Sequence, residues 1–142
     1  MRIIAVMTSM LIFAASFSCG KNKYNDIRQF IDEVVATQNE FLSSMERSSN
    51  ADDAVAAINI FGDKLIVLSG KSVEIKKKHP EIDTWGNNPP DELKKDLAKL
   101  DEPESEFEKV FFSKKLKYIF EDDKVKKAFL NLREKMGNVK FF

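Results

Sequence analysis

The chain has few of the side chains from which most chemical sites are built. It contains one cysteine and one histidine among 142 residues. A single cysteine cannot form an internal disulfide, so the hydrophobic core alone must hold the fold together. One histidine, His79, excludes a histidine-rich metal site and bis-histidine haem ligation. We therefore expect no metal and no cofactor, and we interpret His79 as a helix-end residue, where a cation interacts favourably with the helix dipole.

An excess of either charge is also absent, because 23 basic and 23 acidic side chains cancel. Binding to nucleic acid depends on cationic side chains that neutralise phosphates, so we expect no nucleic-acid partner. Lysines do recur in short runs, at residues 76–78, 94–95, 114–115 and 126–127. Since acidic residues are interspersed with them, we interpret these runs as solvated helix faces. The alternative is that one such face rests on an anionic bilayer.

Catalytic and phosphate-binding motifs are missing as well. The stretch LSGKS at residues 68–72 suggests a phosphate-binding loop, but Leu65 stands where that loop needs a glycine, five places before Gly70. No GxSxG pattern accompanies His79 as the base of a catalytic triad. The acidic stretch DEPESEFE at residues 101–108 lacks the alternating ligands and central glycine of a calcium-binding loop. The chain has no catalytic constellation, and we do not expect an enzyme.

The first eighteen residues differ from the rest of the chain. Arg2 is followed by an almost continuously apolar stretch, residues 3–15, and no acidic residue precedes Asp26. As a helix this stretch would be roughly 20 Å long, which is too short for a hydrocarbon core of about 30 Å. The pattern is typical of an export signal rather than of a transmembrane span. We therefore assign residues 1–18 to a signal peptide.

The residues Ser16, Phe17 and Ser18, followed by Cys19, resemble the lipobox of bacterial lipoproteins. The resemblance implies cleavage before Cys19 and a diacylglycerol on its thiol, although Ser16 stands where leucine is usual in that family. Residues 19–23 would then be a lipidated tether, and the membrane would be a partner through the lipid. Gly20 is not the aspartate that retains such proteins in the inner membrane, so the resemblance implies the outer membrane of a bacterial cell envelope. The alternative is an ordinary signal peptide beside an unpaired cysteine.

The remaining residues, 24–142, are predicted to form a single helical domain. Apolar residues recur at three-and-four spacing from Tyr24 to Met45, which predicts one long helix over residues 23–48. Asn50 is a favourable N-cap for a second helix that ends before Pro80. A strand over KLIVLSG, residues 64–70, is the alternative for its apolar part. Two glycines, Gly62 and Gly70, indicate a close helix contact or a kink.

Three more helices are predicted in the second half. Asn88 is expected to cap one that begins with Pro89, and a second follows Pro103, with Tyr118 among its apolar positions. The last helix is predicted from Asp122 to a C-cap at Gly137. Together these patterns predict an all-α fold, an antiparallel up-and-down helical bundle of about four to five helices.

One long irregular stretch, PEIDTWGNNPPDE, contains the only tryptophan, Trp85. An aromatic residue in such a loop is a candidate for recognition, and we group Asp83, Asn87 and Asn88 with it. The alternative is that Trp85 folds back and covers one end of the bundle. The leading hypothesis is a non-enzymatic, envelope-associated interaction module with an unidentified protein partner. The alternative function is a helical-bundle carrier that binds a small ligand, a lipid or a metal.

Overall fold

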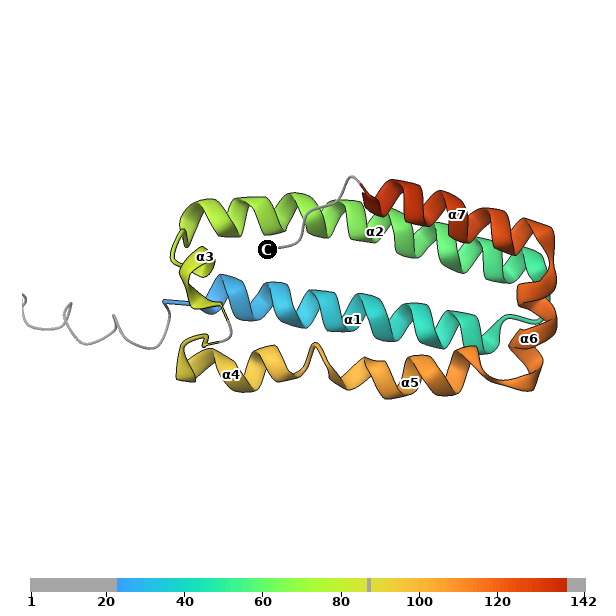
Figure 1. Ribbon diagram of the computed structural model, residues 1–142, viewed down its shortest axis with the longest axis horizontal. Coiled ribbons are helices and arrows are strands. Elements are labelled where there is room, and N and C mark those ends of the chain that lie inside the picture. Colours follow the sequence, from blue (N-terminus) through green and yellow to red (C-terminus); the bar gives the residue numbers. More distant parts are fainter. Residues whose placement is uncertain (1–22, 87, 138–142) are drawn as a thin grey trace, which may run out of the picture.

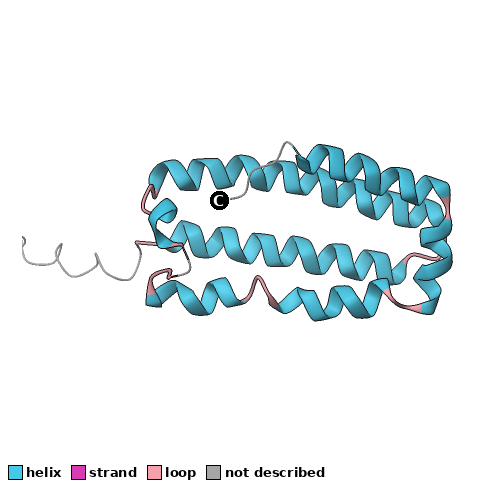
Figure 2. Ribbon diagram, in the orientation of Figure 1, coloured by secondary structure: helices cyan, strands magenta, loops and turns pink. Residues whose placement is uncertain are grey.

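The computed structural model describes residues 23–86 and 88–137, and the regular structure in these ranges is entirely helical (Figures 1 and 2). The helices are α1 (Asn25–Arg47), α2 (Ala51–Lys78), α3 (Ile82–Trp85), α4 (Asp91–Ala98), α5 (Glu102–Phe111), α6 (Lys114–Glu121) and α7 (Asp123–Gly137). The prediction of an all-α, up-and-down bundle is confirmed. Seven helices replace the expected four to five in the described ranges, because a short helix forms at Ile82 and the helix expected after Pro103 is divided at Phe112 and Ser113.

Chain direction alternates along the long axis of the bundle (Figure 1). Helix α1 begins at the end of the bundle that the predicted tether, residues 19–23, would precede, which is called the tethered end below. It runs to the opposite end, and α2 returns antiparallel to it. Helices α4 and α5 then pack in succession along α1, and α6 crosses the far end. Helix α7 packs on α2 and ends partway along it. The tethered end of the bundle therefore has one long helix fewer than the α6 end.

Local sequence signals account for both ends of α2. The Asn50 side chain accepts a hydrogen bond from the backbone N–H of Asp53 at 3.0 Å, and the Asp53 carboxylate accepts one from the backbone N–H of Ser49 at 2.9 Å. These bonds satisfy N–H groups that a helix start leaves unpaired. At the other end the backbone N–H of His79 bonds to the Ile75 carbonyl, and Pro80 follows. The N-cap prediction is confirmed, and the strand alternative over residues 64–70 is wrong because that segment lies within α2.

Gly62 marks the place where α7 approaches α2. A Cβ atom at this position would lie 3.0 Å from Cδ1 of Leu132, which is closer than side-chain atoms normally pack. A Cβ at Gly70 would meet nothing within 4 Å, and α2 continues through that residue without interruption. The expected close contact is therefore found at Gly62.

Two apolar clusters fill the bundle. The one near α6 contains Phe41, Met45 and Ile58, with phenylalanine rings from α5, α6 and α7 around them. Its rings stack, with Phe41 and Phe61 at a centroid distance of 4.3 Å. The other cluster lies at the tethered end and is built on Tyr24, Ile27, Phe30, Ile31 and Leu93. Most of the described phenylalanines thus pack in the two clusters, whereas Phe112 is 85% exposed.

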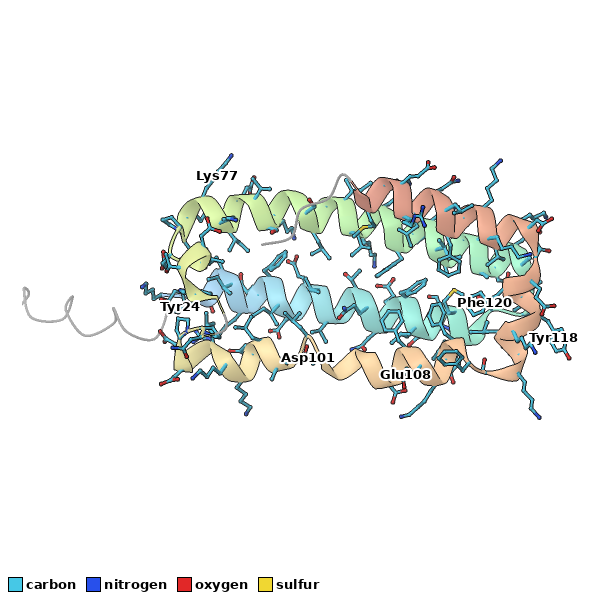
Figure 3. All side chains as sticks on the ribbon, viewed as in Figure 1. Tyr24, Lys77, Asp101, Glu108, Tyr118 and Phe120 are labelled. Atoms are coloured by element: carbon cyan, nitrogen blue, oxygen red, sulfur yellow. The ribbon has the colours of Figure 1, made fainter. Side chains whose placement is uncertain are left out.

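Two local predictions in the second half are wrong. Helix α4 begins at Asp91, with Pro90 rather than Asn88 in the capping position and no side-chain cap. Tyr118 is 75% exposed and points away from the bundle (Figure 3), because α6 crosses the end of the bundle and has one face in solvent.

The hydroxyl oxygen of Ser113 accepts a hydrogen bond from the backbone N–H of Leu116 at 3.3 Å, so Ser113 caps α6. In residues 23–86 and 88–137 no helix is both long enough and apolar enough to cross a bilayer.

Candidate functional site

Trp85 lies at the tethered end, on a segment that is more ordered than its composition suggested. The irregular stretch contains the short helix α3, and Gly86 follows with a φ of 49°, a conformation that favours glycine. This turn brings the half-buried Trp85 ring edge-on against the ring of Tyr24, with centroids 5.7 Å apart. The side chain therefore folds back on the start of α1 and helps to close this end of the bundle.

The residues grouped with Trp85 have different surroundings. Asp83 is exposed, and its carboxylate lies 2.5 Å from Nζ of Lys76. Asn88 is exposed, and its backbone N–H donates a hydrogen bond to the Trp85 carbonyl at 2.8 Å. Asn87 lies outside the described residues. The structure therefore brings Trp85 and Asp83 to one site, described next, and does not bring the Asn88 side chain to it.

A cavity of about 580 Å³ lies between α1, α3 and α4. Trp85 forms part of its wall, together with apolar side chains from α1 and α4 that include Phe30, Val34, Leu97 and Leu100. Among the described residues of the lining, Asp83 is the one that carries a charge. No residue of α7 contributes, because α7 ends partway along α2 (Figure 1). Among the residues that the structure describes, an apolar space thus remains at the tethered end.

One polar group in this lining lacks a hydrogen-bond partner. The side-chain oxygen of Gln38 is buried and makes no hydrogen bond within the described residues. A buried polar group left in this state costs about 1–3 kcal/mol. Because an amide group offers both an oxygen acceptor and N–H donors, it can bind a hydroxyl or carboxyl group. The cavity therefore suits a mostly apolar molecule with one polar group.

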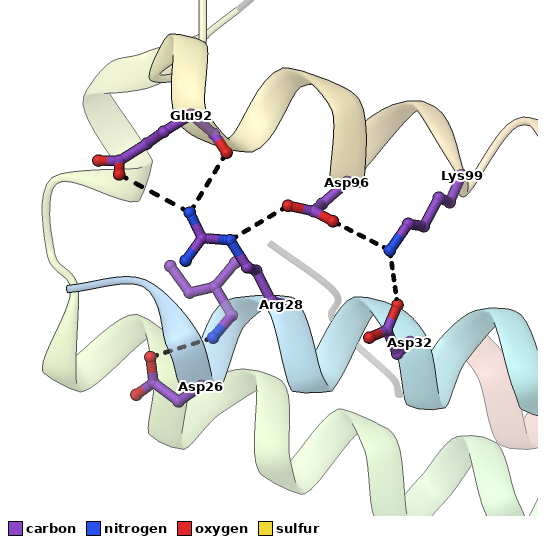
Figure 4. A network of polar contacts seen from close by, with 7 residues as sticks. Asp26, Arg28, Asp32, Glu92, Asp96 and Lys99 are labelled. Atoms are coloured by element: carbon purple, nitrogen blue, oxygen red, sulfur yellow. Dashed lines mark hydrogen bonds and ion pairs between the residues drawn. The ribbon is translucent and has the colours of Figure 1, made fainter. Parts of the chain in front are cut away.

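A network of ion pairs holds α4, and with it one wall of the cavity, against α1 (Figure 4). Arg28 on α1 donates from Nε to the Asp96 carboxylate at 3.2 Å and from Nη2 to the Glu92 carbonyl at 3.3 Å. Lys99 lies 2.9 Å from both the Asp96 and the Asp32 carboxylates. The hydrogen bond from Lys99, with a smaller contribution from Arg28, holds the pKa of Asp96 below its ordinary value. Hydrogen bonds to Asp32 and Asp96 raise the pKa of Lys99.

Sequence reasoning missed both the cavity and this network. Arg28 and Asp96 are 68 positions apart, so no local spacing rule connects them. The one local signal was the pair Arg28 and Asp32, four residues apart on the polar face of α1, a spacing that is also common on solvated helices.

His79 joins the start of α1 to the end of α2. Its Nε2 atom lies 2.9 Å from the Asp26 carboxylate, and its ring contacts Tyr24 with centroids 5.7 Å apart. The side chain is largely buried, so it acts as a structural bridge at the helix end where it was expected. No three His, Cys, Asp or Glu side chains are placed to share a metal ion in the part of the chain that the structure describes.

The predicted lipidation residue, Cys19, lies outside the described residues, as does the signal segment 1–18. No family model matches the chain, and comparisons with curated proteins and with solved structures likewise give no match.

Proposed function

We propose that the chain is an exported, lipid-anchored and non-enzymatic protein of the bacterial cell envelope, held at the outer membrane through Cys19. We further propose that it carries a small apolar or amphipathic molecule in the cavity between α1, α3 and α4. The proposed location is supported by residues 1–19, which resemble a lipoprotein signal. The binding role is supported by the apolar lining of the cavity and by the side-chain oxygen of Gln38, which has no hydrogen-bond partner within the described residues.

The size and lining of the cavity favour a single-chain amphiphile such as a fatty acid. Its volume of about 580 Å³ falls within the range of about 300–1,000 Å³ in which small-molecule sites lie. Apolar walls from α1 and α4 suit an acyl chain, and the Gln38 amide gives a polar group one partner. A metal ion is not favoured, because Asp83 is the only charged group that the described part of the chain contributes to the lining.

The position of the cavity also fits a lipid ligand. Helix α1 begins at Asn25 at the same end of the bundle, so a chain anchored at Cys19 has this end nearest the membrane (Figure 1). The five residues 19–23 span at most about 18 Å when fully extended. A ligand would then pass between bilayer and cavity over a short distance.

The single tryptophan gives a direct test, because Trp85 lies in the cavity wall. We expect 9,10-dibromostearate to quench the fluorescence of the purified full-length chain saturably, since bromine quenches tryptophan on contact. Stearate without bromine is the control and should compete with the quencher. Replacing Val34, a half-buried wall residue, with phenylalanine should reduce the affinity at least tenfold by filling the cavity.

The matched control variant is Val55→Phe. Val55 is also a half-buried helix residue, but it packs against the apolar cluster at the α6 end. The Val55→Phe variant should bind 9,10-dibromostearate with the affinity of the unmodified chain. Quenching that does not saturate, or an equal loss of affinity in both variants, would contradict the carrier proposal.

An interaction module remains a second candidate because of one specific observation at the other end of the bundle. Phe112 and Tyr118 are 85% and 75% exposed there, and large exposed aromatic residues are frequent at protein interfaces (Figure 3). A photo-crosslinking amino acid at position 118 should trap a protein partner in cells. The same group in place of Leu130, which is half exposed on α7, should trap none. Equal crosslinking from both positions would indicate random collisions and would contradict this candidate.

A further inference from the structure

A second surface, separate from the cavity, runs along the groove between α1 and α2. The groove has a volume of about 510 Å³ and shares no lining residue with the cavity at Trp85. Ile60 and Val67 of α2 border it and are 54% and 60% exposed. Two such large aliphatic side chains in one groove form an exposed apolar stripe, which is the kind of surface that marks an interaction site.

The charges on the two sides of this groove have opposite signs. Glu33 and Glu40 lie on the α1 side, and Lys64 and Lys71 lie on the α2 side. Asp63 of α2 also belongs to the lining, but its carboxylate forms an ion pair with Lys135 of α7 at 3.1 Å. Glu33 and Lys71 form an ion pair at 2.6 Å, and Glu40 and Lys64 form another. The two pairs are seven residues apart on each helix, a separation of about 10 Å along the bundle. Glu33 and Glu40 thus form an acidic rim on α1, and Lys64 and Lys71 form a basic rim on α2 at the same two levels.

We propose that a second copy of this chain docks on the groove, with a two-fold axis parallel to α1 and α2. Rotation about such an axis places α1 of one copy over α2 of the other and keeps every residue at its own level. Each glutamate of the acidic rim then faces a lysine of the partner's basic rim. A two-fold axis perpendicular to the helices would instead place the acidic rims face to face, which costs free energy through like-charge repulsion.

Side-chain sizes are complementary in the same arrangement. The ion pairs show that Val67 is level with Ala36 and Thr37, because α1 and α2 run antiparallel. Ile60 is level with Ser44, where the groove continues toward α6. The large residues of α2 in one copy thus lie over small residues of α1 in the other, as in knobs-into-holes packing. A symmetric dimer buries Ile60 and Val67 of both copies.

Charge reversal on one rim tests this proposal with the full-length chain in detergent. We expect the unmodified chain to dimerise reversibly in sedimentation equilibrium with density-matched detergent. The double variant Glu33→Lys and Glu40→Lys has two basic rims, and its dimer dissociation constant should rise at least tenfold. The double variant Lys64→Glu and Lys71→Glu has two acidic rims and should behave in the same way. The exposed intrachain pairs lost in each variant contribute little to stability, and circular dichroism checks the fold.

Mixing the two variants gives the decisive measurement. Basic rims then face acidic rims, so a heterodimer should form with a dissociation constant within about threefold of the unmodified dimer, since each lost attraction is restored. A matched control is Asp91→Lys with Glu106→Lys, which reverses two exposed acids of other ion pairs, on α4 and α5. This control should dimerise normally. The proposal is overturned if the unmodified chain is monomeric up to about 100 μM, if the control dissociates as readily as the rim variants, or if the mixture fails to associate.

Discussion

The contact between α2 and α7 leads to a quantitative prediction at Gly62. Replacing this glycine with alanine adds a Cβ atom 3.0 Å from Cδ1 of Leu132. Carbon atoms pack best at about 3.5–4.0 Å, so the Leu132 side chain or α7 itself must shift by a few tenths of an ångström. Gly70 is the matched reference, because it lies on the same helix and a Cβ there meets nothing within 4 Å.

Two effects of opposite sign determine the result. Alanine in place of glycine within a helix stabilises by about 1 kcal/mol, and this gain applies at both positions. Overpacking at Gly62 costs about 1–3 kcal/mol, whereas Gly70 has no such cost. We therefore expect Gly70→Ala to raise the free energy of unfolding by about 1 kcal/mol. Gly62→Ala should leave it unchanged or lower it by up to about 2 kcal/mol, the difference between these gains and costs.

The assay is urea unfolding of the full-length chain, followed by far-ultraviolet circular dichroism. Shortening Leu132 to alanine removes Cδ1, so Gly62→Ala should stabilise in that background by about 1 kcal/mol, as at Gly70. The double-mutant cycle should give a coupling of about 1–3 kcal/mol between positions 62 and 132. If Gly62→Ala stabilises equally with leucine or alanine at position 132, α7 does not pack on α2 in this way and the reasoning is refuted.

Three further predictions concern charge, capping and the anchor. Asp96→Asn should destabilise the chain more near neutral pH than at pH 2. A carboxylate with a lowered pKa contributes stability above its unfolded value of about 3.8 and loses it as the pH falls through the folded value. Urea unfolding at both pH values checks this, and an equal loss at both would contradict it. Asn50→Ala should lower the free energy of unfolding by about 1 kcal/mol, whereas Asn50→Asp should retain most of the cap; similar losses in both variants would argue against it. Cys19→Ala should abolish the labelling of the protein by radioactive palmitate in cells, and continued labelling would end the lipoprotein hypothesis.

Local signals predicted most of the helices but not all of their ends. The predicted N-cap at Asn50 and the predicted end of α2 before Pro80 are confirmed, because each depends on hydrogen bonds and steric clashes within a few residues. The division between α5 and α6 was missed, although Ser113 followed by a helical pattern is a recognisable N-cap. Asn88 was expected to cap α4 because asparagine is a strong N-cap former, but the helix begins at Asp91 after Pro90. Such residues are found at turns as well as at caps, so composition alone does not locate the first helical residue.

The candidate site was predicted only in part. The sequence singled out Trp85, and the structure places it in the wall of a cavity. The cavity itself depends on where α7 ends relative to α1 and α4, and on the Arg28 and Asp96 contact that holds α4 in place. Both are contacts between segments far apart in the chain, and hydrophobic periodicity describes one helix at a time. The Gln38 amide had no distinguishing signal, because its burial follows from the neighbours that surround it.

By itself, the sequence determined that residues 24–137 form amphipathic helices that pack into a bundle, because helix formation depends on spacing, caps and breakers within a few turns. It also indicated a close helix contact or a kink at Gly62 and Gly70, without deciding between them. Only the tertiary structure decided that α7 approaches α2 at Gly62 and that Tyr118 faces solvent. It alone also decided that the apolar cavity and the groove between α1 and α2 are lined by different residues. These features depend on which side chains from distant segments meet, and that is set by the packing of whole helices rather than by the preference of any one of them.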